Sequence, residues 1–295
     1  MPSSCSSGPL RIGIVGAGPW ARAVTGRVFA AGPDTALAGV WSRTPANAQA
    51  CARELDTSAH DELDSLLAAS DAVAIAVAPE AQPEIAIRCA RAGKALLLEK
   101  PLAVSVTDAE RVVDAIDDAG VPSLLMLTNR FHARFSPFVE EARALGALGG
   151  RGCFLSGAFL PGSPYANGWR LERGALLDVG PHLIDLHDAA LGAVVDVYAA
   201  GDVHGWVSLT LVHETGSTSQ ASLCCRAAIE SRTELEVFGP GGSACFDGRE
   251  GNRRDIGRAM ASTFVQVARG ALPSPAGARR GLELQRVIEK ARAQL

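Results

Sequence analysis

From residue 10 to about residue 124, short apolar runs alternate with longer amphipathic segments. The apolar runs lack the polar–apolar alternation of a half-exposed strand, as in DAVAIAVA at residues 71–78, so we predict strands buried on both faces. The amphipathic segments, such as residues 106–120, have acids near the start and a glycine at the end, which is typical of helices. This repetition indicates a parallel sheet covered by helices on both faces.

After about residue 130 the pattern changes. Two helical segments are predicted at residues 136–148 and 174–192, and two more, residues 255–270 and 281–295, end the chain. Between them, strand-like segments follow one another with Gly-rich or polar turns: residues 151–160, 194–201, 205–214, 218–227, 233–240 and 242–248. Consecutive strands of this kind indicate an antiparallel sheet.

The two patterns predict two domains. We expect a disordered lead-in over residues 1–9, a doubly wound α/β domain over residues 10–124, and an α+β domain with an open, mostly antiparallel sheet over residues 125–295. The length agrees with this division, because 295 residues exceed what one typical hydrophobic core supports.

Composition narrows the functional classes. The formal net charge is −4, so no basic surface indicates a nucleic-acid partner. The seven cysteines are irregularly spaced, which favours free thiols in a reducing compartment over a disulfide or zinc framework. The first residues lack the basic start and apolar run of a signal peptide, and the longest apolar runs are too short to span a membrane. We therefore expect a cytoplasmic protein.

A glycine-rich turn follows the first predicted strand and opens the first predicted helix. In a dinucleotide site, the first glycine permits the tight turn, the second lets the backbone approach a pyrophosphate, and the small last residue keeps the helix near the strand. The helix N-terminus also attracts phosphates. The alternative is a turn without a ligand, but this context favours a nucleotide site. The residues expected at the cofactor are Gly16, Gly18, Pro19, Trp20 and Ala21.

The end of the second predicted strand bears on the choice between NAD and NADP. An acid often holds the ribose 2′-hydroxyl of NAD there, whereas this chain has Ser42, Arg43 and Thr44. No carboxylate is present to repel a 2′-phosphate, and Arg43 can pair with one. We therefore expect these three residues at the cofactor and NADP to be favoured over NAD. The alternative is that Arg43 is a solvated surface charge.

Three further stretches share the order and spacing of motifs in a known family. They are EKPL at residues 99–102, NRF at residues 129–131, and WR at residues 169–170 followed by GALLDVGPHLID at residues 174–185. Together with the glycine turn, they resemble the glucose–fructose oxidoreductase / inositol dehydrogenase / MocA (Gfo/Idh/MocA) family over nearly the whole chain.

The resemblance implies both a fold and an activity. It implies a Rossmann domain followed by a domain with a large open sheet. The implied activity is NAD(P)-dependent hydride transfer at a hydroxyl or carbonyl carbon of a sugar, cyclitol or similar polyol. It also implies a homodimer or homotetramer paired through the open faces of the sheets, and we expect no nucleic-acid or membrane partner.

The resemblance further assigns candidate catalytic residues. The lysine of the E-K-P motif falls on Lys100, which is expected to contact substrate and cofactor, and the bond from Lys100 to Pro101 is expected to be cis. The aspartate and histidine of a D-x-G-x-H segment fall on Asp178 and His182. In polyol dehydrogenases of the family, this histidine is the usual proton-transfer residue.

The chemistry of these residue types agrees with such roles. Asp178 and His182 are four residues apart in a predicted helix and share one face. A histidine has a pKa close to working pH and suits proton transfer, and the ammonium of Lys100 can stabilise negative charge on the same oxygen. The structural alternatives are an ion pair between Lys100 and Glu99, a His182 satisfied within its helix, and an Asp178 that acts as a cap-like acid.

Four more residues are candidates for the substrate pocket. They are Asn129, Tyr165, Trp169 and Arg170. Tyr165 lies in a loop that can cover the pocket, which makes it a reserve candidate for the proton donor, and Trp169 is equally consistent with a core position. The remaining histidines show no metal-ligand spacing, so we expect no metal.

The sequence departs from the family pattern after the third buried strand. The family often has a proline, three residues and then a histidine, whereas here Pro79 is followed by EAQP at residues 80–83. We still expect Ala78, Pro79 and Glu99 at the cofactor. The departure and the short second domain keep open a second function, a dinucleotide-binding sensor or regulator without turnover. The family that the chain resembles also includes members that use NAD in net non-redox reactions, so a third function is a non-redox NAD-dependent lyase or glycosidase that recycles its cofactor.

Overall fold

The computed structural model describes residues 8–166 and 168–295, so most of the expected lead-in, residues 1–7, lies outside the described residues. The chain forms two compact units. The first contains residues up to 126 together with residues 257–282, and the second contains residues 127–256 together with residues 283–295. The sequence division instead assigned everything after residue 124 to the second domain.

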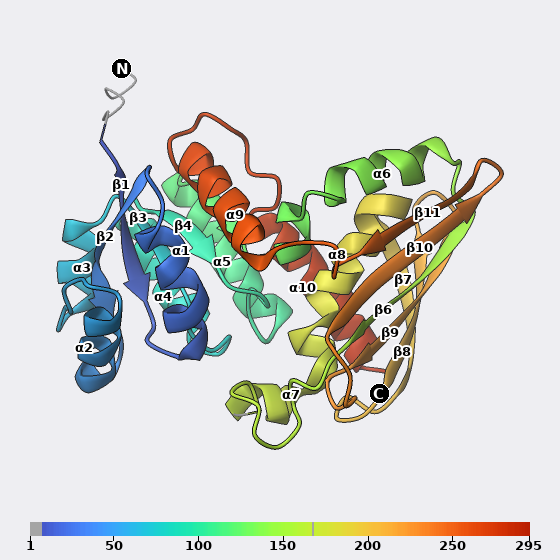
Figure 1. Ribbon diagram of the computed structural model, residues 1–295, viewed down its shortest axis with the longest axis horizontal. Helices are drawn as coiled ribbons and strands as arrows, with labels where there is room; N and C mark the ends of the chain where they lie inside the picture. The colour runs from blue at the N-terminus through green and yellow to red at the C-terminus, as the bar shows by residue number, and fades with distance from the viewer. Residues whose placement is uncertain (1–7, 167) are drawn as a thin grey trace. The chain divides into compact units, whose positions relative to one another are not determined.

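The first unit is built on a parallel sheet of five strands (Figure 1). Across the sheet the strands are β2 (Thr35–Trp41), β1 (Leu10–Val15), β3 (Ala72–Ile75), β4 (Ala95–Leu98) and β5 (Ser123–Leu125). Every residue of β3 and β4 is buried, as expected of strands covered on both faces. The predicted doubly wound sheet is confirmed.

Helices connect these strands. They are η1 (Ala21–Thr25, a π-helical turn), α1 (Gly26–Ala30), α2 (Pro45–Glu54), α3 (Leu63–Ala69), α4 (Gln82–Arg91) and α5 (Val106–Ala119). The ends of α5 show why such segments are recognisable from sequence. The Ser105 hydroxyl accepts a hydrogen bond from the Asp108 backbone N–H at 3.1 Å, and Gly120 ends the helix in a left-handed conformation.

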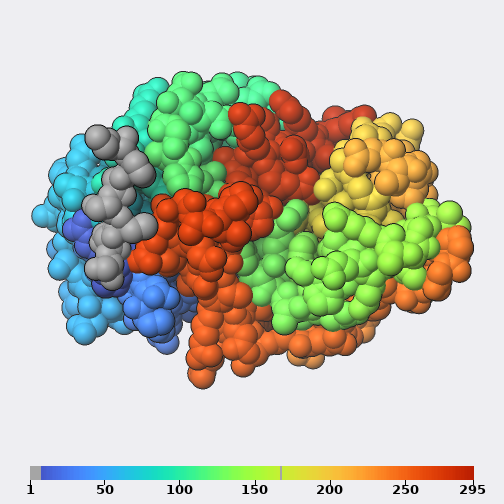
Figure 2. Space-filling view, turned by 90° about the horizontal axis from the view of Figure 1, so that it is seen from above, coloured from blue at the N-terminus to red at the C-terminus, as the bar shows by residue number. Residues whose placement is uncertain are grey.

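Most of α9 (Arg253–Ala268) and the segment after it pack in the first unit. The ring of Phe264 lies 5.8 Å from that of Phe29, and the backbone N–H of Leu125 donates to the carbonyl of Ala276 at 2.7 Å. Figure 2 shows this orange-red segment against the blue N-terminal part of the chain. These long-range contacts explain the return of residues 257–282 to the first unit.

The second unit is built on a sheet of six strands. Across the sheet they are β11 (Gly242–Asp247), β10 (Arg232–Gly239), β6 (Gly149–Leu155), β9 (Thr218–Cys224), β8 (Val207–His213) and β7 (Val194–Gly201). Among the described strand pairs of this sheet, only β6 with β9 is parallel. The predicted mostly antiparallel sheet is confirmed.

One face of this sheet is covered by helices α6 (Phe135–Ala144) and α8 (Gly180–Leu191), as Figure 1 shows. In Figure 2 the light-green α6 runs beside the orange β10 and β11. The unit also contains η2 (Thr128–Phe131), α7 (Gly168–Asp178) and the end of α10 (Ala278–Arg292). The buried core between α6, α8 and the sheet consists of Phe135, Phe138, Val139, Ala142, Leu186, Ala190, Leu191, Leu235, Val237, Ala244 and Phe246.

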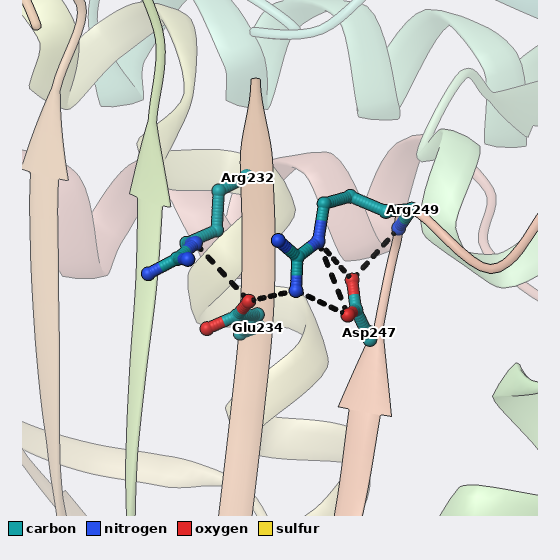
Figure 3. Close-up of polar contacts among 4 residues, drawn as sticks. All are labelled: Arg232, Glu234, Asp247 and Arg249. Carbon is teal, nitrogen blue, oxygen red and sulfur yellow. Dashed lines mark hydrogen bonds and ion pairs between the residues drawn. The ribbon is translucent and has the colours of Figure 1, made fainter. Parts of the chain in front are cut away.

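The opposite face of the same sheet carries a charged cluster (Figure 3). Glu234 alternates with the buried Leu235 and therefore points away from the core. Its carboxylate pairs with Arg232 at 3.1 Å and Arg249 at 2.8 Å, and Arg249 also pairs with Asp247 at 2.6 Å. Arg249 lowers the pKa of the Asp247 carboxyl. Because these groups are exposed or partly exposed, water screens the pairs and each adds little to the stability of the fold.

No described helix is long and apolar enough to cross a membrane. No group of three or more His, Cys, Asp and Glu side chains in the described ranges has the arrangement needed to hold a metal ion.

Candidate active site

The glycine turn lies where the strand order of the parallel sheet reverses. β1 has β2 on one side and β3 on the other, and ligands of open α/β sheets bind beyond the carboxyl ends of the strands at such a point. Gly16 directly follows β1 with a φ of 113°, which L side chains rarely adopt. A Cβ there would lie 2.2 Å from the carbonyl oxygen of Ala76, so only glycine fits.

The turn leaves space on its outer side. A Cβ at Gly18 would meet no heavy atom within 4 Å, so protein packing does not require this glycine, whereas close approach of a phosphate does. Arg22 braces the turn, because its Nε donates to the carbonyl of Ala17 at 2.9 Å and its guanidinium pairs with Glu54. Ala21 is buried at the start of η1. The turn therefore fits a bound pyrophosphate.

Two larger residues complete the turn. Pro19 is exposed and Trp20 is half-buried. The indole Nε1 of Trp20 donates to the sulfur of Met126 at 3.4 Å, and Met126 directly follows β5. The ring is thereby anchored within the first unit.

An exposed arginine, Arg43, lies just after the end of β2. Ser42 donates from its hydroxyl to the carbonyl of Thr44 at 2.8 Å, and Pro45 begins α2. Between them Arg43 is exposed, and it makes no ion pair with any residue that the structure describes. Its guanidinium is free to bind an anionic group.

Lys100 lies in the loop that follows β4. The peptide bond from Lys100 to Pro101 is cis, as the family resemblance implies. Ala78 and Pro79 follow β3, the neighbouring strand. Because the strands are parallel, these residues and the glycine turn lie along the same carboxyl edge of the sheet. Glu99, which precedes the lysine, is almost completely buried.

Asp178 and His182 lie where α7 meets α8. The single helix predicted over residues 174–192 is two helices that meet at Val179, and α7 is bent at Gly174, where φ is 78°. Helical hydrogen bonding nevertheless continues through the junction, because the N–H of Val179 donates to the carbonyl of Ala175 at 2.9 Å. Asp178 is 5% exposed and His182 is 6% exposed, so both are shielded from water.

A cationic stack adjoins Asp178. The guanidinium of Arg170 lies 4.7 Å from the ring centroid of Trp169 and 5.7 Å from that of Tyr165. Its Nε lies 3.5 Å from the Asp178 carboxylate. The structure therefore brings three of the four expected pocket residues together around one catalytic candidate.

The fourth, Asn129, lies against the other candidate. Its Nδ2 donates to the backbone carbonyl of His182 at 3.4 Å. Next to it, Arg130 donates from Nε and Nη2 to both carboxylate oxygens of Asp185, at 2.7 and 2.8 Å. Asp185 is buried on α8, so this ion pair holds η2 against the helix that carries His182.

A network of buried hydrogen bonds connects the C-terminal half of α8 to strands β8 and β9. Nδ1 of His213 lies 2.7 Å from the carbonyl of Gly192 and must donate to it. Nε2 of His213 is then an acceptor for the Ser219 hydroxyl at 2.8 Å, and that oxygen accepts from Nδ1 of His187, also at 2.8 Å. This arrangement requires neutral histidines, which agrees with their burial, because burial lowers the pKa of both. Sequence reasoning missed this network, because its residues come from β8, β9 and α8, which are separate in the sequence.

Sequence reasoning also missed Gln82. This fully buried side chain is hydrogen-bonded to the backbone on both sides of Lys100. The only sequence signal was a glutamine directly before Pro83 at a helix start, which does not reveal a distant backbone partner.

Comparison with known proteins places both units in one family. The model of an oxidoreductase family with an NAD-binding Rossmann fold (GFO/IDH/MocA) matches residues 10–126. The model of the GFO/IDH/MocA C-terminal domain matches residues 141–245.

Individual proteins resemble the chain as well. A dTDP-3,4-didehydro-2,6-dideoxy-alpha-D-glucose 3-reductase of Streptomyces violaceoruber is 32% identical over 65% of this chain and 57% of its own length. Inositol 2-dehydrogenase of Rhizobium meliloti is 27% identical over 81% of this chain and 76% of its own length. The matched part of the chain thus spans little more than half of the reductase.

A solved structure shares the complete fold. The structure of GenD2 from gentamicin A biosynthesis, in complex with NAD, superposes with a TM-score of 0.86 and 21% identity. The superposition covers 99% of this chain and 95% of that one.

Proposed function

Because the chain belongs to the GFO/IDH/MocA oxidoreductase family, we propose that it transfers a hydride between a nicotinamide cofactor and a hydroxyl or carbonyl carbon of a sugar, cyclitol or similar polyol. The observation that carries the proposal is that Lys100 and the glycine turn follow parallel strands of one sheet, at the edge where ligands of such sheets bind. The names of a sugar 3-reductase and an inositol 2-dehydrogenase among the relatives support the substrate class.

The first unit is an NAD-binding Rossmann domain. When bound, the nicotinamide supplies the hydride donor or acceptor. The chain contributes the binding groups, with the backbone N–H groups of the glycine turn at the pyrophosphate. The cofactor residues that we propose are Gly16, Gly18, Pro19, Trp20, Ala21, Ser42, Arg43, Thr44, Ala78, Pro79, Glu99 and Lys100.

Three side chains manage the reacting oxygen in this proposal. His182 takes the hydroxyl proton during oxidation and returns it during reduction. The ammonium of Lys100 stabilises negative charge on the same oxygen, and Asp178 orients His182 or binds a neighbouring hydroxyl. The burial of Asp178 and His182 supports these roles, because it limits competition from water for the proton.

The substrate contacts that we propose are Asn129, Tyr165, Trp169 and Arg170. The stacked arrangement of Arg170 on Trp169 and Tyr165 supports this, since it restricts the guanidinium to one place. Flat rings beside an arginine and a carboxylate suit a sugar, which has apolar C–H faces and hydroxyl edges.

We further propose that NADP is favoured over NAD. The support is the exposed Arg43, which has no acidic neighbour at the end of β2. Arg43→Ala should raise the Kd for NADP by about tenfold, the equivalent of about 1.4 kcal/mol, and leave the Kd for NAD unchanged. Titration of both cofactors, with the exposed Arg53→Ala as the control, measures this. Equal Kd values for NADP in the Arg43 variant and the unchanged protein would contradict it.

The protein is proposed to be a cytoplasmic homodimer or homotetramer with small-molecule substrates only. The sheet face opposite α6 and α8 carries the exposed Phe238 as well as the ion pairs of Glu234, and it supports an interface between copies. Sedimentation at several concentrations tests the assembly.

The activity itself is tested by incubating the protein with NAD or NADP and a panel of cyclitols and sugars. We expect reduced nicotinamide, detected by its absorbance, to appear in step with an oxidised product. Consumption of substrate without net reduction would instead identify a non-redox lyase or glycosidase. Cofactor binding without chemistry on any substrate would identify a sensor or regulator.

A further inference from the structure

The side chain of Gln82 is fully buried at the first residue of α4. Its Nε2 donates to the carbonyl oxygens of Glu99, Pro101 and Leu102, at 2.7, 3.1 and 3.0 Å. Its Oε1 accepts from the backbone N–H of Glu99 at 2.8 Å. All four contacts go to residues that flank Lys100, and every polar atom of the amide is used.

A primary amide is the group that these contacts require. The loop after β4 presents three buried carbonyls and one N–H, which need donors and an acceptor at one point, because buried polar groups without partners are costly. An amide offers two N–H donors and a carbonyl in one plane. Glutamate offers no donor when ionised, and leucine offers neither donor nor acceptor.

Lys100 lies between two residues that Gln82 holds, Glu99 and Pro101. The carbonyls of Glu99 and Pro101, on either side of Lys100, are bonded to one rigid side chain at the start of α4. The direction in which the lysine side chain leaves the backbone is therefore set by Gln82. This is also the segment after Pro79 in which the sequence lacks the family's histidine.

We propose that Gln82 is a positioning residue for Lys100, which fixes the loop from Glu99 to Leu102 so that the ammonium is aimed at the reacting oxygen. The inference rests on the proposed function, because it assigns Lys100 a part in turnover. It adds a residue outside the recognised motifs that acts on the catalytic step through Lys100.

The first test compares Gln82→Leu with a matched control. Gln285 is also buried, at 1% exposure, but its amide has no hydrogen-bond partner among the described residues. Active sites are counted by cofactor titration, so that unfolded protein does not enter kcat. Gln82→Leu should lower kcat by at least about tenfold, in line with the cost of misplacing a catalytic group by about 1 Å, and should weaken cofactor binding by no more than Lys100→Met does. Gln285→Leu should leave both constants unchanged.

A double-mutant cycle separates positioning from general damage. If Gln82 acts through Lys100, Gln82→Leu should cost less than about twofold in kcat when Lys100 is already Met. A purely structural role would produce the same factor in both backgrounds. If Gln82→Leu does not fold, Gln82→Asn, which keeps the amide but shortens its reach, is measured in the same cycle.

The outcomes are distinguishable from failure of the proposed function. If the unchanged protein oxidises no substrate, the proposed function fails. If it turns over and the Gln82 variants retain its kcat at equal active-site concentration, or lose the same factor with Lys100 absent, the positioning role is overturned while the activity stands.

Discussion

Replacing His182 with Asn, or Lys100 with Met, should lower kcat by about a thousandfold, within the range that general acid–base catalysis contributes. The cofactor Kd should change less than about threefold for His182→Asn, because His182 is not among the proposed cofactor contacts. Lys100→Met should weaken cofactor binding more, because Lys100 is also a proposed cofactor contact. Steady-state kinetics at saturating cofactor, with active sites counted by titration, provide the measurement.

The chain offers matched controls for both variants. His204 is an exposed histidine in the turn between β7 and β8, and Lys290 is an exposed lysine that pairs with Asp196. His204→Asn and Lys290→Met should retain the full kcat. If His182→Asn and Lys100→Met turn over at the unchanged rate as well, the assignment of both catalytic residues is wrong.

The second large effect concerns stability in acid. Burial lowers the pKa of His187 to about 3, and burial also lowers the pKa of His213. At neutral pH both residues are neutral whether the chain is folded or unfolded. As pH falls below about 6.5, the unfolded chain binds protons at these histidines that the folded chain does not bind. The free energy of unfolding should therefore fall with pH between about 6.5 and 3.

The size of this effect follows from linkage. Each histidine contributes a slope of about 1.4 kcal/mol per pH unit, so His187 alone should cost about 2–3 kcal/mol between about pH 6.5 and 4.5. Urea unfolding at several pH values measures the slope. His187→Asn removes the titrating group, so it should reduce the slope by about 1.4 kcal/mol per pH unit, the contribution of one bound proton. The same variant should lower the free energy of unfolding at neutral pH. An unchanged slope would mean that His187 is not kept neutral by the fold, and His204→Asn serves as the control.

Local features were predictable because local sequence causes them. The buried strands and the turn at Gly16 depend on apolar runs and on a backbone conformation that glycine alone adopts readily. The end of α5 at Gly120 is of the same kind. These features sufficed for the fold of both units and for the location of the nucleotide turn.

What escaped prediction depends on contacts between distant residues. The return of α9 to the first unit depends on Phe264 meeting Phe29, which no periodicity reveals. The ion pair of Arg130 with Asp185 joins residues 55 positions apart, so no local pattern reveals it. Gln82 escaped for the same reason, since its partners are the backbone of another loop.

Hydride transfer to the nicotinamide can be followed with an isotope. The protein is incubated with oxidised cofactor and cyclitols or sugars that carry deuterium on the carbinol carbons, and the reduced cofactor is analysed by mass spectrometry. We expect one deuterium in the nicotinamide ring for each molecule of oxidised product. Product formation without deuterium in the cofactor, or no product from any member of the panel, would contradict it.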